Sequence, residues 1–258
     1  MKRCWAEALG DCAGPITGEH VVSRAVFTED HVTVKGFRWC RDEPRQIGLN
    51  SLTVNVLCAH HNNTLTSLDD AAGDAMRVFR ESLKTSERNK RLMPWVLPTV
   101  KRFRLDAALL ERWMLKTSLN IKHGRMLTEG NLDISDVATT VEAELCFGRR
   151  PFEGVAGMYV AYSENMKLNL IDKVEIVTLV DSGDLVGVRF ELHGFRFVLN
   201  LRSTKPIPPL ETIPGMDPAW AGAYLSRPFK HARFNHMSWP SHYVDFDWSS
   251  AVSLPAHP

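Results

Sequence analysis

The sequence predicts an α+β protein in three parts. Cysteines and glycine-punctuated segments with short strands gather in residues 1–75, apolar residues recur at helical spacing in a basic segment at 76–128, and apolar runs separated by turn signals fill a β-rich domain at 129–258. With 258 residues, the chain can bury a sizeable core in more than one domain.

The composition is that of a folded, water-soluble chain, with 44% hydrophobic and 24% charged residues. No run approaches the roughly 20 apolar residues that cross a bilayer, and the basic start of the chain is not followed by the apolar core of a signal peptide. We therefore expect a cytoplasmic protein without a membrane partner. In a reducing compartment, clustered cysteines are better explained as metal ligands than as disulfides. Cys146, far from the others in an apolar setting, is expected to be a buried free thiol.

The first part is expected to hold short strands and the start of a helix. Residues 1–17 are predicted to form a loop because glycine and cysteine interrupt any regular pattern. Alternation and β-branched residues favour strands at 19–27, 31–37 and 52–57. A turn-rich connector occupies 42–48, and from about Ala59 the pattern becomes helical.

Two helices are predicted in the middle part. Ser67-x-x-Asp70 resembles a capping box, and apolar positions at helical spacing follow it: Ala71, Ala75, Val78, Phe79 and Leu83. Prolines between 93 and 100 end this helix. Asp106 is a suitable N-cap for a second helix through about Lys122, with an inward face of Leu109, Leu110, Trp113 and Leu119.

The third part is predicted to be an antiparallel meander. Strand-like runs separated by turn signals lie at 155–161, 174–180, 185–192 and 195–201. Aromatic residues in the tail from Lys205 are expected to cover this sheet. We expect the domain to act in sensing, specificity or oligomerisation, through contact with a protein partner or a second copy of the chain.

A zinc site is predicted from the cysteines and one histidine. Cys58-x-x-His61 has the short spacing of a tetrahedral zinc pair, and Cys4 with Cys12 can complete four ligands. The spacing between Cys4 and Cys12 is wide, which leaves Cys40 as a substitute ligand. A core position is nevertheless favoured for Cys40, because it follows an aromatic residue.

Glu19 and His20 form a second candidate site. Hydrolysis of a phosphodiester needs an activated water, and a cation that offsets charge on the phosphate and on the departing oxygen. An imidazole with a pKa near neutrality is suited to take a proton from water. Neighbouring residues at a strand end point to different sides, so one of the two can face a metal and the other the water.

The two motifs together resemble the HNH endonucleases, the ββα-metal nuclease family. The resemblance is carried by Glu19-His20-Val21-Val22-Ser23 and by Leu57-Cys58-x-x-His61-Asn62. The continuation Leu65-Thr66-x-Leu68-Asp69 is similar to a bacterial and phage subgroup in which Leu-Ser-x-Leu-Asp follows Cys-x-x-His-Asn. The resemblance covers about residues 1–70, with weaker support from 110–116.

The resemblance implies a role for each of these residues. His20 would be the general base, while Glu19 and Asn62 would hold a catalytic Mg²⁺ or Mn²⁺, with Asn63 as the alternative to Asn62. An amide oxygen is a legitimate ligand for such a hard cation. Structural Zn²⁺ would be held by Cys4, Cys12, Cys58 and His61. The middle asparagine of the family's motif is left unassigned.

Positive charge gathers after these motifs, although the net charge of the chain is only +1. Residues 77–125 contain thirteen Lys and Arg and four acidic residues. Such a segment can bind the phosphate backbone of DNA, or of RNA, and the predicted nucleic-acid contacts are Lys101, Arg102 and Arg104. A solvated helical face is the alternative interpretation.

These features predict a metal-dependent HNH endonuclease that hydrolyses phosphodiester bonds of DNA. The alternative is a zinc-stabilised nucleic-acid-binding module without catalysis, attached to a partner-binding β domain. A module that only held zinc could dispense with Glu19 and His20. Both residues are present, which favours the enzyme.

Overall fold

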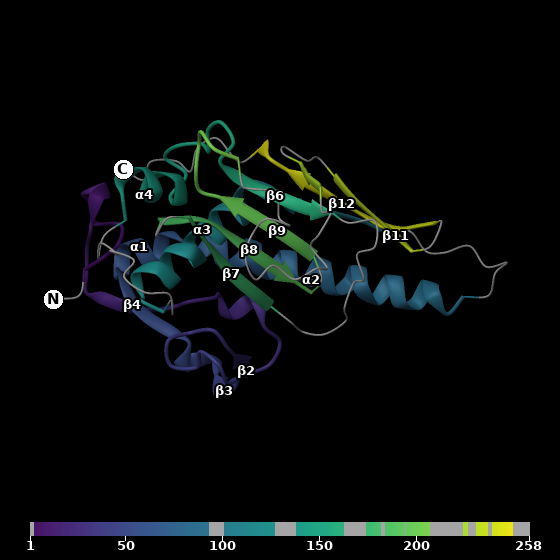
Figure 1. Cartoon of the computed structure of the whole chain (residues 1–258), viewed down its shortest axis with the longest axis horizontal. Helices are drawn as coiled ribbons and strands as arrows, with labels where there is room; N and C mark the ends of the chain where they lie inside the picture. The colour runs from purple at the N-terminus through teal and green to yellow at the C-terminus, as the bar shows by residue number, and fades with distance from the viewer. Residues whose placement is uncertain are drawn as a thin grey trace. The chain divides into compact units, whose positions relative to one another are not determined.

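A computed structural model describes residues 3–92, 101–126, 138–162, 174–181, 184–193, 195–206, 224–226, 231–236 and 239–249. These residues form a mixture of helices and sheets, which confirms the predicted α+β class (Figure 1). They fall into two compact units, the first made of 1–73 and 112–151 and the second of 74–111 and 152–250. The first unit thus extends beyond residue 75, and the three-part division at 75 and 128 stays a prediction.

The first unit is built on an antiparallel pair of strands followed by a helix. β1 (Ile16–His20) pairs with β4 (Thr53–Cys58), and α1 (Ala59–Thr64) begins at the next residue. The strand predicted at 52–57 and the helix expected from Ala59 are therefore confirmed. α2 (Thr66–Lys90) follows, with its first turns in this unit.

The segment between β1 and β4 differs from the prediction in two places. The strand expected at 19–27 is instead β1, which begins at Ile16 within the predicted loop and ends at His20. After Val21 and Val22, which are buried, the chain turns into a 3₁₀ helix, η2 (Arg24–Val26). β2 (His31–Val34) pairs with β3 (Arg45–Gly48), so part of the predicted connector is a strand. Two further 3₁₀ turns are η1 (Glu7–Leu9) and η3 (Leu49–Ser51).

α3 (Ala107–His123) belongs to the first unit from residue 112 onward. The predicted N-cap is confirmed, because the Leu109 N–H donates to Asp106 Oδ1 at 2.9 Å. Of the four residues predicted to face inward, Leu110, Trp113 and Leu119 are buried, while Leu109 is half-buried.

α4 (Thr140–Cys146) completes the described part of the first unit. It begins with a capping box formed by Thr139 and Glu142. Cys146 at its end is a free thiol with no exposed surface, as expected, and burial raises its pKa to about 12.

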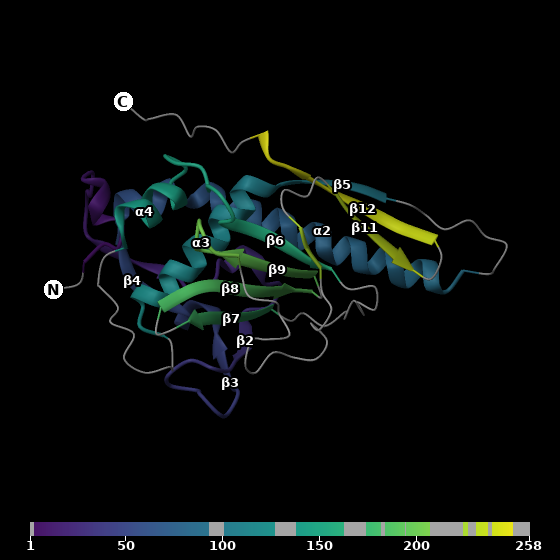
Figure 2. The ribbon, with the colours of Figure 1, turned by 45° about the horizontal axis from the view of Figure 1, so that its top comes forward.

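The second unit contains the predicted meander. β6 (Gly157–Tyr162), β7 (Val174–Asp181), β8 (Asp184–Leu192), β9 (Phe195–Asn200) and β10 (Tyr224–Ser226) form an antiparallel sheet. Its strand order is β10-β6-β9-β8-β7, and β8 and β9 form the expected hairpin. α2 runs along this sheet (Figures 1 and 2), and the Phe79 and Phe195 rings stack with centroids 4.2 Å apart.

A second sheet of this unit joins segments far apart in the sequence. β5 (Lys101–Asp106) pairs in parallel with β12 (Trp239–Asp247), which pairs with β11 (His231–His236). The middle segment was predicted to be helical, so β5 was not predicted. Its partner strand lies far along the chain, so local periodicity could not reveal the pairing. None of the described helices is both long and apolar enough to cross a membrane.

Candidate metal centre and active site

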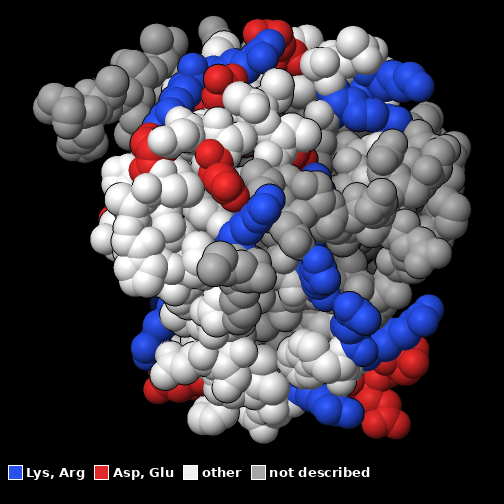
Figure 3. Space-filling model, turned by 90° about the vertical axis from the view of Figure 1, so that its left-hand side faces the viewer, with Lys and Arg blue, Asp and Glu red and all other residues white. Residues whose placement is uncertain are grey.

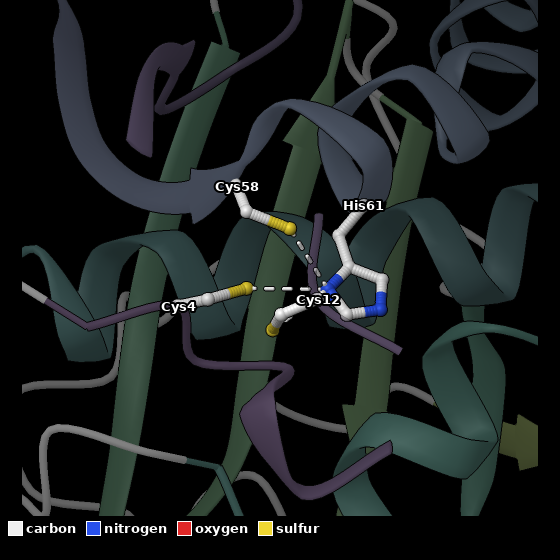
Figure 4. Close-up of side chains that lie close together, drawn as sticks. All are labelled: Cys4, Cys12, Cys58 and His61. Carbon is white, nitrogen blue, oxygen red and sulfur yellow. Dashed lines mark hydrogen bonds between the residues drawn. The ribbon is translucent and has the colours of Figure 1, made fainter. Parts of the chain in front are cut away.

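Four potential ligand atoms come together in the first unit. The Sγ atoms of Cys4, Cys12 and Cys58 and a ring nitrogen of His61 all lie within 4.8 Å of one another (Figure 4). The distances from His61 Nδ1 are 3.3 Å to Cys4 and Cys58 and 3.6 Å to Cys12. These four residues can bind a metal such as zinc. Cys40 is buried outside this cluster and is therefore not a fourth ligand in place of Cys4 or Cys12.

Backbone hydrogen bonds hold the two halves of the cluster together. Cys58 ends β4 and His61 lies in the first turn of α1, so strand and helix place them side by side. The loop that carries the other two cysteines is fixed to the same elements, because the N–H groups of Ala59 and His60 donate to the carbonyls of Pro15 and Ala13. The spacing between Cys4 and Cys12 is wide because η1 lies within it.

Asp11 orients the histidine of the cluster. The His61 Nε2–H donates to Asp11 Oδ1 at 2.7 Å, which leaves Nδ1 as the acceptor atom facing the three sulfurs. Burial of Asp11 opposes its ionisation, but hydrogen bonds and charge from Arg149 and His61 lower its pKa. A carboxylate behind a ligand histidine is the usual support for zinc. Sequence analysis missed this residue, although an acid directly before a ligand cysteine was a usable signal.

The three thiols of the cluster differ in their tendency to ionise. Burial and the neighbouring sulfurs raise the pKa of Cys12 to about 12, and burial raises the pKa of Cys4. Burial opposes the ionisation of Cys58, but hydrogen bonds from the backbone of His61 and Ala13 lower its pKa. Three thiols this close repel one another once ionised. A divalent cation among them would offset that repulsion and release their protons.

Glu19 lies next to a buried lysine. The register of the β1–β4 pair shifts between Thr17 and Glu19, and the Glu19 side chain is only 6% exposed. Its Oε1 lies 2.6 Å from Nζ of Lys116, whose side chain is 1% exposed. The same Nζ lies 2.8 Å from both carboxylate oxygens of Asp69. One ammonium group is thus shared by two carboxylates.

One face of α3 supplies this lysine and two further contacts. Trp113 Nε1 donates to Ser23 Oγ at 2.7 Å, and Ser23 Oγ donates to Asp69. Asn120 Nδ2 donates to the backbone carbonyl of His20 at 3.2 Å. Trp113, Lys116 and Asn120 are three and four residues apart, so they lie on one side of the helix.

Asn62 faces β1, and Asn63 does not. Asn62 Nδ2 donates to Thr17 Oγ1 at 3.1 Å. Burial raises the pKa of Glu19, while Lys116 and a hydrogen bond from Asn62 lower it. Asn63 is exposed. Of the two alternatives, Asn62 is the residue that lies close to Glu19.

His20 ends β1 with a half-buried side chain. Its Nε2 atom is buried and has no hydrogen-bond partner among the described residues. Burial lowers its pKa below the ordinary value of 6.5. The negative charge of Asp69 raises this pKa, and the positive charges of Arg24 and Lys116 lower it. The ring is therefore neutral at pH 7 and can accept a proton.

The predicted nucleic-acid contacts lie in the second unit and already have acidic partners. On β5, Arg102 Nε lies 2.6 Å from Asp245 and Arg104 Nε lies 3.1 Å from Asp247. Lys101 Nζ lies 3.5 Å from Glu81. Their role in DNA binding stays a prediction. Because each of these three side chains has an acidic partner, they carry less unbalanced positive charge than the sequence implied. On the face drawn in Figure 3, Lys and Arg side chains are interspersed with Asp and Glu.

No family model, curated protein or solved structure matches this chain. The resemblance to HNH endonucleases therefore depends on the residues of the first unit alone.

Proposed function

We propose that the first unit is a metal-dependent HNH-type endonuclease that hydrolyses phosphodiester bonds of DNA. The main support is the position of Glu19 and His20 at the end of β1, with Asn62 from the first turn of α1 beside Glu19. The same helical turn carries His61 of the cysteine cluster. This combination of a strand pair, a helix and a possible Cys/His metal site supports the proposal.

In this proposal, His20 is the general base. Its neutral ring takes a proton from a water molecule, the water oxygen forms a bond to phosphorus, and the bond between phosphorus and the departing oxygen breaks. The Asn120 side chain holds the backbone of His20 at the end of the strand. The lowered pKa of His20 keeps the base unprotonated at neutral pH.

The catalytic cation would be held by Glu19 and Asn62. A carboxylate and an amide oxygen are ligands that Mg²⁺ and Mn²⁺ accept. When bound, the cation supplies positive charge that offsets the charge developing on the phosphate and departing oxygen.

Zinc at Cys4, Cys12, Cys58 and His61 would be structural. Four protein ligands leave no open position, which is the arrangement of structural and not catalytic zinc sites. Asp11 would hold the histidine in the tautomer that binds the metal.

The test is a metal count followed by a plasmid-nicking assay. Purified protein should contain one zinc per chain and should nick plasmid DNA with Mg²⁺ or Mn²⁺. His20→Ala should lower the nicking rate by about 10²- to 10⁴-fold with unchanged zinc content and thermal unfolding. His31→Ala, an exposed histidine on β2 of the same unit, is the matched control and should cut normally. Protein that holds zinc but cuts neither DNA nor RNA with either cation would exclude the nuclease.

One observation favours the alternative of a zinc-stabilised nucleic-acid-binding module. The Lys116 ammonium already balances charge on Glu19, as it would if that carboxylate served the fold alone. The module would then retain zinc and bind DNA without cutting it, so the same assay separates the two functions.

A further inference from the structure

In the Lys116 cluster, one ammonium group contacts two carboxyl groups. We define it as Lys116 with Glu19 and Asp69, whose contacts with the ammonium are 2.6 and 2.8 Å. Two carboxylates share one ammonium, and the Glu19 and Lys116 side chains are buried while the Asp69 side chain is 29% exposed. Lys122, six residues further along α3, has one acidic partner among the described residues, Glu142 at 2.8 Å.

The ammonium cannot easily leave this position. The Lys116 side chain is 1% exposed, and its neighbours on the same helical face are anchored to the strand region. Trp113 is bonded to Ser23, and Asn120 to the backbone of His20. Movement of Lys116 out of the cluster would therefore require α3 to shift. It would also leave the two carboxyl groups without the ammonium that contacts them among the described residues.

Resting on the proposed function, we infer that Lys116 acts as a built-in cation that keeps divalent-metal binding weak until a substrate phosphate is present. Lys116 contacts Oε1 of Glu19, the carboxylate that would hold the catalytic cation. A divalent cation on that carboxylate would lie only a few ångströms from the ammonium, and like charges at that separation repel strongly where water is excluded. A phosphodiester adds a negative charge that offsets the repulsion, so metal and nucleic acid should bind together.

The inference extends the role of α3. Lys116 touches neither the water nor the phosphate in this proposal, so it is a positioning residue and not a catalytic one. It would set the charge of the site, and Asp69 would set how much of the ammonium's charge reaches Glu19. The coupling between metal and substrate is then a property of these two residues.

The experiment measures Mn²⁺ binding directly, by the electron paramagnetic resonance signal of free Mn²⁺. All proteins carry His20→Ala, so that a short DNA duplex stays intact. For the parent, the duplex should tighten Mn²⁺ binding by about tenfold, a typical coupling between two sites. With Lys116→Met, Mn²⁺ should bind about tenfold more tightly without DNA, and the effect of the duplex should largely disappear. Lys122→Met is the matched control and should behave as the parent does.

A second variant addresses loss of folding. Asp69→Asn leaves Lys116 paired with Glu19 alone and creates no unpaired ammonium. It should weaken Mn²⁺ binding without DNA relative to the parent, because the full charge of the ammonium then acts on Glu19. Unchanged Mn²⁺ affinity in both variants would overturn the inference, as would the absence of Mn²⁺ binding in every protein.

The two proposals fail in different ways. If the wild-type chain cuts DNA but Lys116→Met and Asp69→Asn bind Mn²⁺ as the parent does, the nuclease stands and the role of Lys116 falls. If the wild-type chain cuts nothing, the nuclease falls, whatever the Mn²⁺ titrations give.

Discussion

The first unit contains two polar clusters, which differ in the source of the positive charge that can balance their acidic groups. The cysteine cluster brings three thiols around one imidazole and can bind a metal ion such as zinc. The Lys116 cluster brings two carboxylates around an ammonium that is covalently part of the chain. A protein can thus balance negative groups with a bound ion or with one of its own side chains, and only the ion can be removed without a mutation.

The largest effect is expected from breaking the cysteine cluster. Cys58→Ser should abolish zinc binding and the cooperative unfolding of the first unit, because structural zinc supplies much of the stability of a small module. Zinc content by mass spectrometry and thermal unfolding measure the outcome. Cys146→Ala, a buried thiol outside the cluster, should keep its zinc. A Cys58→Ser protein with normal zinc and normal unfolding would show that the cluster is not a metal site.

The next largest effect should come from removing the ammonium. Lys116→Ala leaves two carboxylates without their described cation, and breaking a buried ion pair from one side costs about 3–5 kcal/mol. Urea unfolding measures this free energy. Lys122→Ala breaks a pair in which both side chains are 21% exposed, so it should cost clearly less. Equal losses in the two variants would contradict the special burial assigned to Lys116.

A smaller effect is expected from the support of the cysteine cluster. Asp11→Asn should lower zinc affinity by about 10- to 100-fold, because the carboxylate no longer orients the ligand histidine. Competition with a chromogenic zinc chelator measures the affinity. The protein should still purify with zinc and fold. Asp30→Asn, an exposed acid paired with Arg24 in the same unit, is the control and should leave zinc affinity unchanged.

The smallest effect concerns acid stability. Burial opposes the ionisation of Glu142, but the hydrogen bond and charge of Lys122 lower its pKa below the ordinary 4.5. A carboxyl group with a lowered folded-state pKa stabilises the fold above its unfolded-state pKa and loses that contribution as the pH falls through the folded-state value. The stability difference between wild type and Glu142→Gln should therefore be constant above about pH 5 and should shrink at lower pH. Unfolding curves between pH 3 and pH 7 test this. A stability difference that grew at low pH would contradict a lowered pKa for Glu142.

The parts of the fold that local patterns determine were predictable. Alternation gave the strand before Cys58 and the meander of the second unit, and the carboxylate of Asp106 caps α3 as its position suggested. The set Cys4, Cys12, Cys58 and His61 also lies together, because a short Cys-x-x-His spacing at the start of a helix constrains geometry strongly.

The unpredicted features all depend on contacts between distant segments. β5 is a strand because β12 pairs with it across more than a hundred residues of sequence, which no local window can register. Lys116 was counted only as one charge in a basic segment, although its partners Glu19 and Asp69 lie in the first seventy residues. Its spacing of three and four residues from Trp113 and Asn120, which places all three on one side of the helix, was the available signal.

The hydrogen-bonded loop that carries Cys4 and Cys12 has a consequence for biosynthesis. All four members of the cysteine cluster have left the ribosome once residue 61 has emerged, whereas Lys116 emerges 55 residues later. If the cysteine cluster binds zinc as proposed, it can do so on a nascent chain while Glu19 and Asp69 still lack their ammonium. The strand that ends in His20 reaches its final electrostatic environment only after α3 has been translated.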